Sequence, residues 1–163
     1  MRNIPLLLIA LFFVGCASTQ PKKVSKGMRA GEHMTVRTTA YTQTEPGGAN
    51  NACGGRLHFG GDSFSAASDW SWLPLGTRFK MLSNGRSYVI EDYGSALVGR
   101  KTIDLFMPSR QMMRAWGTRN VEIEIIEWGS EAMSLKLLAP RCRNHHVAVM
   151  VAQLRKKGAP SPS

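Results

Sequence analysis

The sequence is poor in cysteine, in acidic residues and in long hydrophobic runs. Its three cysteines lack the spacing of a zinc site with the histidines, so we expect neither a metal nor another cofactor. Eleven Asp and Glu residues face 21 Lys and Arg, and the formal net charge of +10 indicates polyanionic surroundings: cell-wall carboxylates, anionic lipid or nucleic acid. The apolar run from Ile4 to Val14 is shorter than the roughly 20 residues that span a bilayer.

The first 15 residues have the pattern of an export signal. Arg2 precedes the apolar run, which ends at Phe13-Val-Gly-Cys16 and looks like a bacterial lipobox. We therefore expect residues 1–15 to be a lipoprotein signal peptide, with Cys16 as the lipid-modified first residue. Ordinary cleavage near Ala17 and an uncleaved membrane anchor are the alternatives. Ala17 replaces the aspartate typical of inner-membrane retention, which favours an outer-membrane anchor facing the periplasm. Export argues against nucleic acid as a partner.

After the expected signal peptide, the sequence predicts a tether, one domain and a C-terminal extension. Residues 16–33 are polar, basic and poor in apolar side chains, which is typical of a flexible tether. The remaining chain suits one domain with a modest core, at residues 34–128, followed by a C-terminal extension at residues 129–163. In an oxidising periplasm Cys53 and Cys142 can pair, although the sequence does not fix the geometry that a disulfide needs.

The domain alternates short predicted strands with turns. β-Branched residues predict a first strand over Thr35–Thr42. Asn84-Gly85 separates the alternating segments Thr77–Leu82 and Ser87–Asp92, which indicates a β-hairpin. Alternating valine, isoleucine and glutamate predict a half-buried strand over residues 121–125. Several short strands separated by long turns favour a small β-barrel.

Between these strands the sequence predicts one long loop and one short helix. Glu45–Gly61 is rich in glycine, and long loops in compact domains are more often functional than idle. Ser109 is suited to cap a helix that ends at Gly117, and Met112 and Trp116 share a face that we assign to the core.

Other segments leave two interpretations open. Met133–Leu138 is interpreted as a further strand, whereas Val147–Leu154 fits a helix and a strand equally well. Trp70 and Trp72 can stack on a sugar ring or pack in the core.

Two aspartates surround a glycine-containing turn. Strand alternation puts Tyr88, Ile90 and Asp92 on one face, so Asp92 has apolar neighbours that raise its pKa. Asp104 lies within the apolar run Ile103–Leu105 and is expected to be buried and to need a partner. Taken one at a time, each aspartate is better explained as a turn former or a satisfied structural acceptor.

Several ordered blocks between Met34 and Glu127 resemble the bacterial 3D domain, a family named for three aspartates. The residues that carry the resemblance are Ala40-Tyr41-Thr42 (the family's Ala-Tyr-Thr), Ala52-Cys-Gly54 (its glycine-containing loop), Asp69 with Pro74-Leu-Gly-Thr77 (its first aspartate and Pro-Leu-Gly-Thr), Asp92-Tyr-Gly-Ser-Ala-Leu-Val-Gly99 (its Asp-Thr-Gly-Gly-Ala-Ile-Lys-Gly) and Ile103-Asp-Leu105 (its final Ile-Asp-Leu).

The resemblance implies a mainly β fold: a six-stranded double-psi β-barrel with one or two short helices, here followed by an irregular C-terminal extension. This barrel is shared with the membrane-bound lytic transglycosylase A group and with expansins, which implies action on peptidoglycan glycan strands. It makes Asp92 the catalytic acid/base, with Asp104 and Asp69 orienting the site, bonding the sugar or modulating the pKa of Asp92. The residues expected to bind substrate are Tyr41, Thr42, Tyr93, Gly94 and Ser95.

One acid suffices for a lytic transglycosylase, because the C6 hydroxyl of the sugar replaces the water that ordinary glycosidases activate with a second carboxylate. Tyr93, Ser95 and Val98 stand where the family carries threonine, glycine and lysine. A non-catalytic peptidoglycan-binding module of the same fold is therefore the alternative. An aspartic protease, suggested by Asp92-Tyr-Gly-Ser95, is disfavoured because a second copy of the motif is missing.

Overall fold

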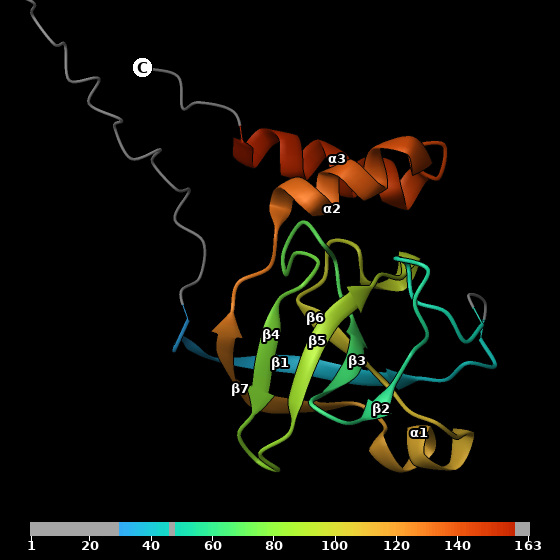
Figure 1. The fold of residues 1–163 in the computed structure, drawn as a ribbon, viewed down its shortest axis with the longest axis vertical. Coiled ribbons are helices and arrows are strands. Elements are labelled where there is room, and N and C mark those ends of the chain that lie inside the picture. The colour runs from blue at the N-terminus through green and yellow to red at the C-terminus, as the bar shows by residue number, and fades with distance from the viewer. Residues whose placement is uncertain (1–29, 46–47, 159–163) are drawn as a thin grey trace, which may run out of the picture.

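The computed structural model describes residues 30–45 and 48–158 (Figure 1). The predicted signal peptide, Cys16 and most of the predicted tether lie outside the described residues. Seven strands form one mixed sheet in the order β2-β3-β5-β4-β7-β1-β6, with a further pairing between β3 and β6. The strands are β1 (His33–Tyr41), β2 (Phe59–Gly60), β3 (Ser63–Ala67), β4 (Arg78–Met81), β5 (Ser87–Asp92), β6 (Thr102–Phe106) and β7 (Arg119–Glu127).

The pairing between β3 and β6 closes the sheet on itself. β2 pairs with the start of β3, and β6 pairs with Ala66 and Ala67 further along the same strand. The six strands other than β2 therefore form a closed ring of hydrogen-bonded pairs. Two of these pairs, β1–β6 and β3–β5, are parallel. The prediction of a mainly β domain is confirmed, with seven strands in the described residues where six were expected.

Alternating side chains build the core inside this ring. On β5, Tyr88 and Ile90 are 1% and 0% exposed, as strand alternation predicts. The rings of Tyr88 and Phe79 stack at 5.3 Å between their centroids. The predicted hairpin is confirmed, because β4 and β5 pair antiparallel and Gly85 takes the positive φ of 68° that the turn requires.

Helix α1 (Arg110–Trp116) covers one end of the ring (Figure 1). The side chain of Ser109 accepts a hydrogen bond from the Met112 backbone, and Gly117 ends the helix with φ of 62°, so both predicted caps are confirmed. The assignment of Met112 to the core is wrong, whereas Trp116 is half-buried and packs against the core. No residue of α1 is buried, and Met112 is 39% exposed.

The C-terminal extension is helical, which corrects the expectation of an irregular segment and raises the number of α-helices in the described chain to three. Its elements are α2 (Glu131–Leu138), the short 3-10 turn η2 (Ala139–Arg141) and α3 (His145–Gly158). Met133–Leu138, interpreted as a strand, lies in α2, because the side chain of Ser130 caps the backbone of Met133. The segment Val147–Leu154, which fitted a helix and a strand equally well, lies in the helix α3. Its buried residues follow helical spacing: Val147, Met150, Val151 and Leu154.

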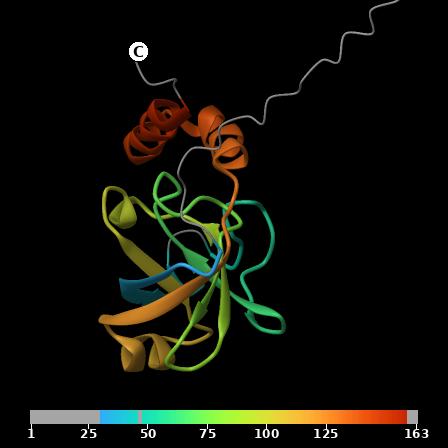
Figure 2. The ribbon, with the colours of Figure 1, turned by 90° about the vertical axis from the view of Figure 1, so that its left-hand side faces the viewer.

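Helices α2 and α3 lie side by side over the end of the ring opposite α1 (Figures 1 and 2). The loop before α2 docks on the turn Pro74-Leu-Gly-Thr77: Ser130 N donates to Leu75 O at 2.9 Å, and Leu75 N donates to Ser134 Oγ at 2.9 Å. No helix in the described part of the chain combines the length and the apolar character needed to cross a bilayer.

Candidate functional site

The sheet places Asp92 and Asp104 in one row across three strands. Ala67 on β3 is level with Asp92 on β5 at one edge and with Asp104 on β6 at the other. Thr39 on β1 extends the row beyond Asp104. Because adjacent strands lie about 4.8 Å apart, the backbones of the two aspartates are separated by about 10 Å.

Asp92 combines burial with hydrogen bonds to its carboxylate. Oδ1 accepts from the backbone N–H of Tyr93 at 2.9 Å, and Oδ2 accepts from the hydroxyl of Tyr41 at 3.4 Å. The backbone of Ala52 supplies a further hydrogen bond. Burial raises the pKa of Asp92 and outweighs these bonds, which favour the ionised form. The predicted direction of the pKa shift is confirmed.

Asp104 is the more strongly shifted acid. Burial raises its pKa from 3.8 to about 6, and the negative charges of Glu45 and Asp92 contribute to the rise. A partner was expected for Asp104, and the structure identifies it as Thr39, whose hydroxyl donates to Asp104 Oδ1 at 2.6 Å. Burial and the charges of Asp92 and Asp104 also raise the pKa of Tyr41, so its hydroxyl remains a donor at neutral pH. Two acids and one phenol thus occupy one neighbourhood.

Asp69, the third aspartate of the resemblance, has a different environment. It is 2% exposed, and both of its carboxylate oxygens are occupied by protein donors. Oδ1 accepts from the backbone and hydroxyl of Ser71 at 2.8 and 2.6 Å, and Oδ2 accepts from the backbone of Gly99 at 2.8 Å. Ser71 is in turn hydrogen-bonded to Gln153 of α3. Through Ser71 and Gln153, Asp69 therefore links the loop before β6 to helix α3.

The residues expected to bind substrate separate into two groups. Tyr41 contacts Asp92, and Ser95 is exposed at the start of the 3-10 turn η1 (Ser95–Leu97), for which Gly94 is the N-cap. Thr42 is 2% exposed, and its hydroxyl bonds Thr44 at 2.7 Å within its own loop. The structure thus brings Tyr41 to Asp92, leaves Ser95 exposed and buries the Thr42 side chain within its own loop.

Tyr93 packs against the extension and the core. Its ring centroid lies 5.0 Å from that of Trp70 and 6.2 Å from that of His146 on α3. Trp70 is fully buried and donates its Nε1–H to the backbone oxygen of Asp92 at 2.9 Å, so of the two roles left open for it, core packing is the one observed.

Arg141 is a residue of the site that sequence reasoning missed. It lies in η2, and its Nη1 donates to the backbone oxygen of Ala52 at 3.0 Å and contacts the Tyr93 hydroxyl at 3.5 Å. Ala52 and Tyr93 are the two residues whose backbones bond the carboxylate of Asp92. No local pattern around Arg141 signals this role, because its partners lie in distant parts of the sequence.

The predicted long loop is held against the sheet beside Asp92. His58 and Ser65 share a hydrogen bond of 3.0 Å between Nδ1 and Oγ, and both contact the carboxylate of Glu91, His58 at 3.3 Å. Cys53 Sγ contacts the backbone oxygen of Glu91 at 3.8 Å. Cys53 and Cys142 are both free thiols, so the pairing considered for them is not made in this structure.

Comparison with protein families gives one assignment. Residues 64–127 match the family model of the 3D domain, a span that runs from β3 to the end of β7 and contains Asp69, Asp92 and Asp104. β1 and the C-terminal helices lie outside the matched span. A comparison with curated proteins finds no match. The family match therefore supports the resemblance to the 3D domain, over residues 64–127.

Proposed function

We propose that this protein is a cell-envelope lipoprotein that cleaves the glycan strands of peptidoglycan by a lytic transglycosylase reaction during peptidoglycan turnover. The observation that carries the proposal is the row formed by Asp92 and Asp104, two carboxyl groups whose pKa values are both raised by burial. Carboxyl groups that retain a proton nearer to neutral pH are suited to act as general acids.

In the proposed reaction Asp92 acts twice. Its protonated carboxyl gives a proton to the glycosidic oxygen as the C1–O bond breaks. The resulting carboxylate then takes the proton of the C6 hydroxyl as that oxygen bonds C1, which forms an anhydro sugar and restores the acid. Tyr41 orients the carboxyl of Asp92. Asp104 modulates its pKa, because the coupling between two charged groups acts in both directions.

The barrel type, the lipid anchor, the location and the polymer partner belong to the same proposal. A closed ring of six strands with two parallel pairs supports a double-psi β-barrel, the fold implied by the 3D resemblance. The lipobox-like Phe13-Val-Gly-Cys16 supports a lipid anchor at Cys16 and a location at the outer membrane, facing the periplasm. The excess of Lys and Arg suits a partner that carries carboxylates, such as peptidoglycan.

One observation favours a second candidate, a peptidoglycan-binding module of the same fold without activity. Tyr93, immediately after Asp92, carries a large ring that packs against α3, and α2 and α3 cover this end of the ring of strands (Figure 2). Such packing restricts the approach of a polymer to Asp92.

Digestion of purified sacculi separates the two candidates. We expect the protein to release anhydro-muramic products, measured by mass spectrometry, and Asp92→Asn to reduce their release by at least about 100-fold. Asp62→Asn, at an exposed aspartate, is the matched control and should retain full activity. Binding to sacculi without products would favour the non-catalytic module, and full activity of Asp92→Asn would remove Asp92 from the mechanism.

A further inference from the structure

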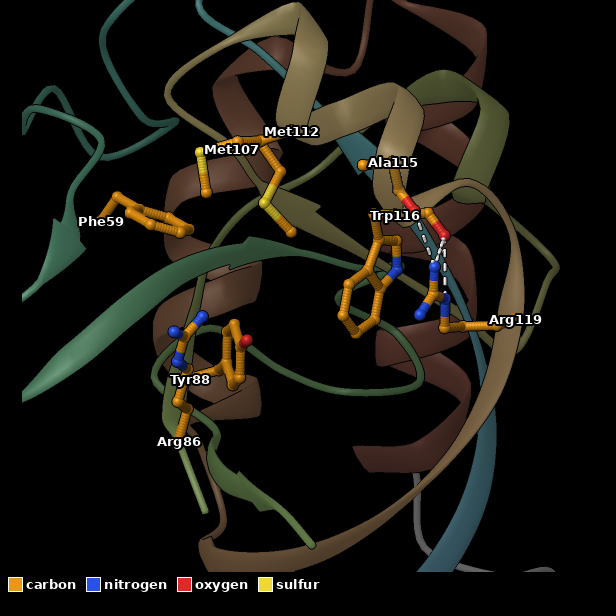
Figure 3. Close-up of a pocket in the computed structure, with 8 residues that line it drawn as sticks. All are labelled: Phe59, Arg86, Tyr88, Met107, Met112, Ala115, Trp116 and Arg119. Carbon is orange, nitrogen blue, oxygen red and sulfur yellow. Dashed lines mark hydrogen bonds between the residues drawn. The ribbon is translucent and has the colours of Figure 1, made fainter. Parts of the chain in front are cut away.

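A cavity of about 210 Å³ lies beside α1, and neither Asp92 nor Asp104 lines it (Figure 3). Tyr88 contributes one wall, and it precedes Asp92 by about 13 Å along β5 at the usual strand rise of about 3.3 Å per residue. α1 borders the cavity with the residues that the sequence assigned to the core. The apolar walls are formed by Phe59, Tyr88, Met107, Met112, Ala115 and Trp116.

These walls combine fixed rings with flexible thioethers. The Nε1–H of Trp116 donates to Thr38 Oγ1 at 3.2 Å, which sets the orientation of the indole. Met107 and Met112 face it from the other side of the cavity (Figure 3), and methionine adapts readily to the shape of a ligand. Water in such a cavity finds few hydrogen-bond partners, so an apolar group that displaces it is favoured.

Two guanidinium groups flank this apolar cavity. Arg119 stacks over Trp116 at 4.3 Å and donates to the backbone oxygens at the end of α1. Arg86 lies over the ring of Phe64 at 5.2 Å. No residue that lines the cavity is acidic, and the sequence has no Asp or Glu between Asp104 and Glu122. The charge at the cavity is therefore complementary to an anion.

We propose that this cavity binds the hydrocarbon chain of a single-chain anionic amphiphile, such as a fatty acid, whose head group pairs with Arg86. The volume is below the range of about 300–1,000 Å³ that drug-sized ligands occupy, which suits one chain rather than two. This site is separate from the acid row, and the inference does not depend on the proposed glycan cleavage.

Calorimetric titration with dodecanoate below its micelle concentration tests the proposal. We expect saturable binding, whereas dodecyltrimethylammonium, which has the same chain and the opposite charge, and acetate, which lacks the chain, should not bind. Arg86→Gln should weaken binding about tenfold, equivalent to about 1.4 kcal/mol. Ala115→Leu places a larger side chain at the cavity and should abolish it. Lys136→Gln removes one exposed charge from α2, at the other end of the molecule, and should bind as the native protein does.

Three outcomes would overturn the proposal. The first is no binding of dodecanoate, and the second is equal binding of the anionic and cationic amphiphiles. The third is binding to phosphatidylglycerol vesicles without binding to free dodecanoate, which would show attraction of the arginines to an anionic surface in place of a cavity site. Circular dichroism serves to check that Arg86→Gln and Ala115→Leu are folded. The first variant tests the contact with the head group, and the second tests the site of the hydrocarbon chain.

Discussion

The three aspartates differ at the level of single residues in what their carboxyl groups contact. Asp69 is buried and has protein donors on both oxygens, one of which is the backbone N–H of Gly99. Asp92 and Asp104 keep raised pKa values in spite of their hydrogen bonds, because burial disfavours the charged form of each. A carboxyl group whose pKa is raised by burial lowers the stability of the folded state at neutral pH, where the group must ionise. Strongly shifted pKa values occur often at functional sites, so these two acids are candidates for such a site.

Asp104→Asn should stabilise the protein at neutral and alkaline pH. The raised pKa means that the folded state holds more protons than the unfolded state between about pH 4 and about pH 6, so native stability falls as pH rises through this interval. Asparagine has no proton to lose and still accepts the hydrogen bond of Thr39. We expect the variant to be more stable by about 1–3 kcal/mol at about pH 8, since one pKa unit is worth about 1.4 kcal/mol, and nearly unchanged at about pH 4.

Urea unfolding of the native protein and of Asp104→Asn at the two pH values measures this difference. Asp62→Asn, an exposed control, should be as stable as the native protein at each of the two pH values. A variant that is less stable than the native protein at the higher pH would mean that the ionised carboxylate of Asp104 contributes to the fold.

At this scale strand alternation predicts which side chains share a face, and Tyr88 and Ile90 are both buried as it predicts. It does not supply partners from distant segments. The contacts of Tyr93 with α3 and of Asp69 with Gly99 depend on how separate elements pack, so no local sequence pattern reveals them.

The junction between the ring and α2 is the most sterically restricted element of the extension. A Cβ atom on Gly129 would lie 2.4 Å from Leu75 O and 2.5 Å from Pro74 O, closer than real Cβ contacts allow. We expect Gly129→Ala to destabilise the protein by about 1–3 kcal/mol, the usual cost of overpacking, measured by thermal unfolding. Gly158→Ala at the end of α3, where a Cβ meets nothing within 4 Å, is the control and should not destabilise. An unchanged melting temperature for Gly129→Ala would show that α2 undocks freely.

Arg141 links the extension to the acid site and gives a second prediction for this element. Without its side chain, Ala52 and Tyr93 lose the contacts that position their backbones beside Asp92. Because hydrogen bonds to the carboxylate favour its ionised form, Arg141→Ala should raise the pKa of Asp92, measured by NMR titration of its labelled carboxyl carbon. It should also lower stability by about 1–2 kcal/mol.

Arg143→Ala removes an exposed arginine two positions away and serves as the matched control for charge. If both variants move the pKa of Asp92 equally, the effect is long-range electrostatics, and Arg141 has no positioning role. The NMR measurement does not require catalysis, so it remains valid for a non-catalytic module.

Elements with a strong hydrophobic period or clear capping residues were predictable from the sequence. Very short elements, and elements that depend on packing against the rest of the domain, were not. β4, β5 and β7 follow from alternation, and α1 follows from Ser109 and Gly117. β2 has two residues, too few to show a period. The apolar side chains of α2 fit a strand as well as a helix, and only the cap at Ser130 distinguishes them.

For the whole molecule, α2 and α3 lie over one end of the ring of strands, and α1, which borders the apolar cavity, lies over the other (Figure 1). The fold class was predictable because several short alternating segments can bury their apolar faces only by closing on one another. The helical extension was not, since its helices depend on packing against each other and on the turn that follows Asp69.

Binding of the whole molecule to sacculi should depend strongly on salt. The formal net charge of +10 attracts a carboxylate-rich polymer over distances set by ionic screening, whose length falls from about 10 Å at about 0.1 M NaCl to about 3 Å at about 1 M. We expect the fraction that sediments with sacculi to fall about tenfold over this range, and binding to chitin, a glycan without carboxylates, to be weak throughout. Asp92→Asn should sediment as the native protein does, because the attraction arises from many basic residues and not from the acid row. Salt-independent binding, or equal binding to chitin, would instead assign recognition to short-range contacts with the sugar rings, and the excess of Lys and Arg would then require another anionic partner.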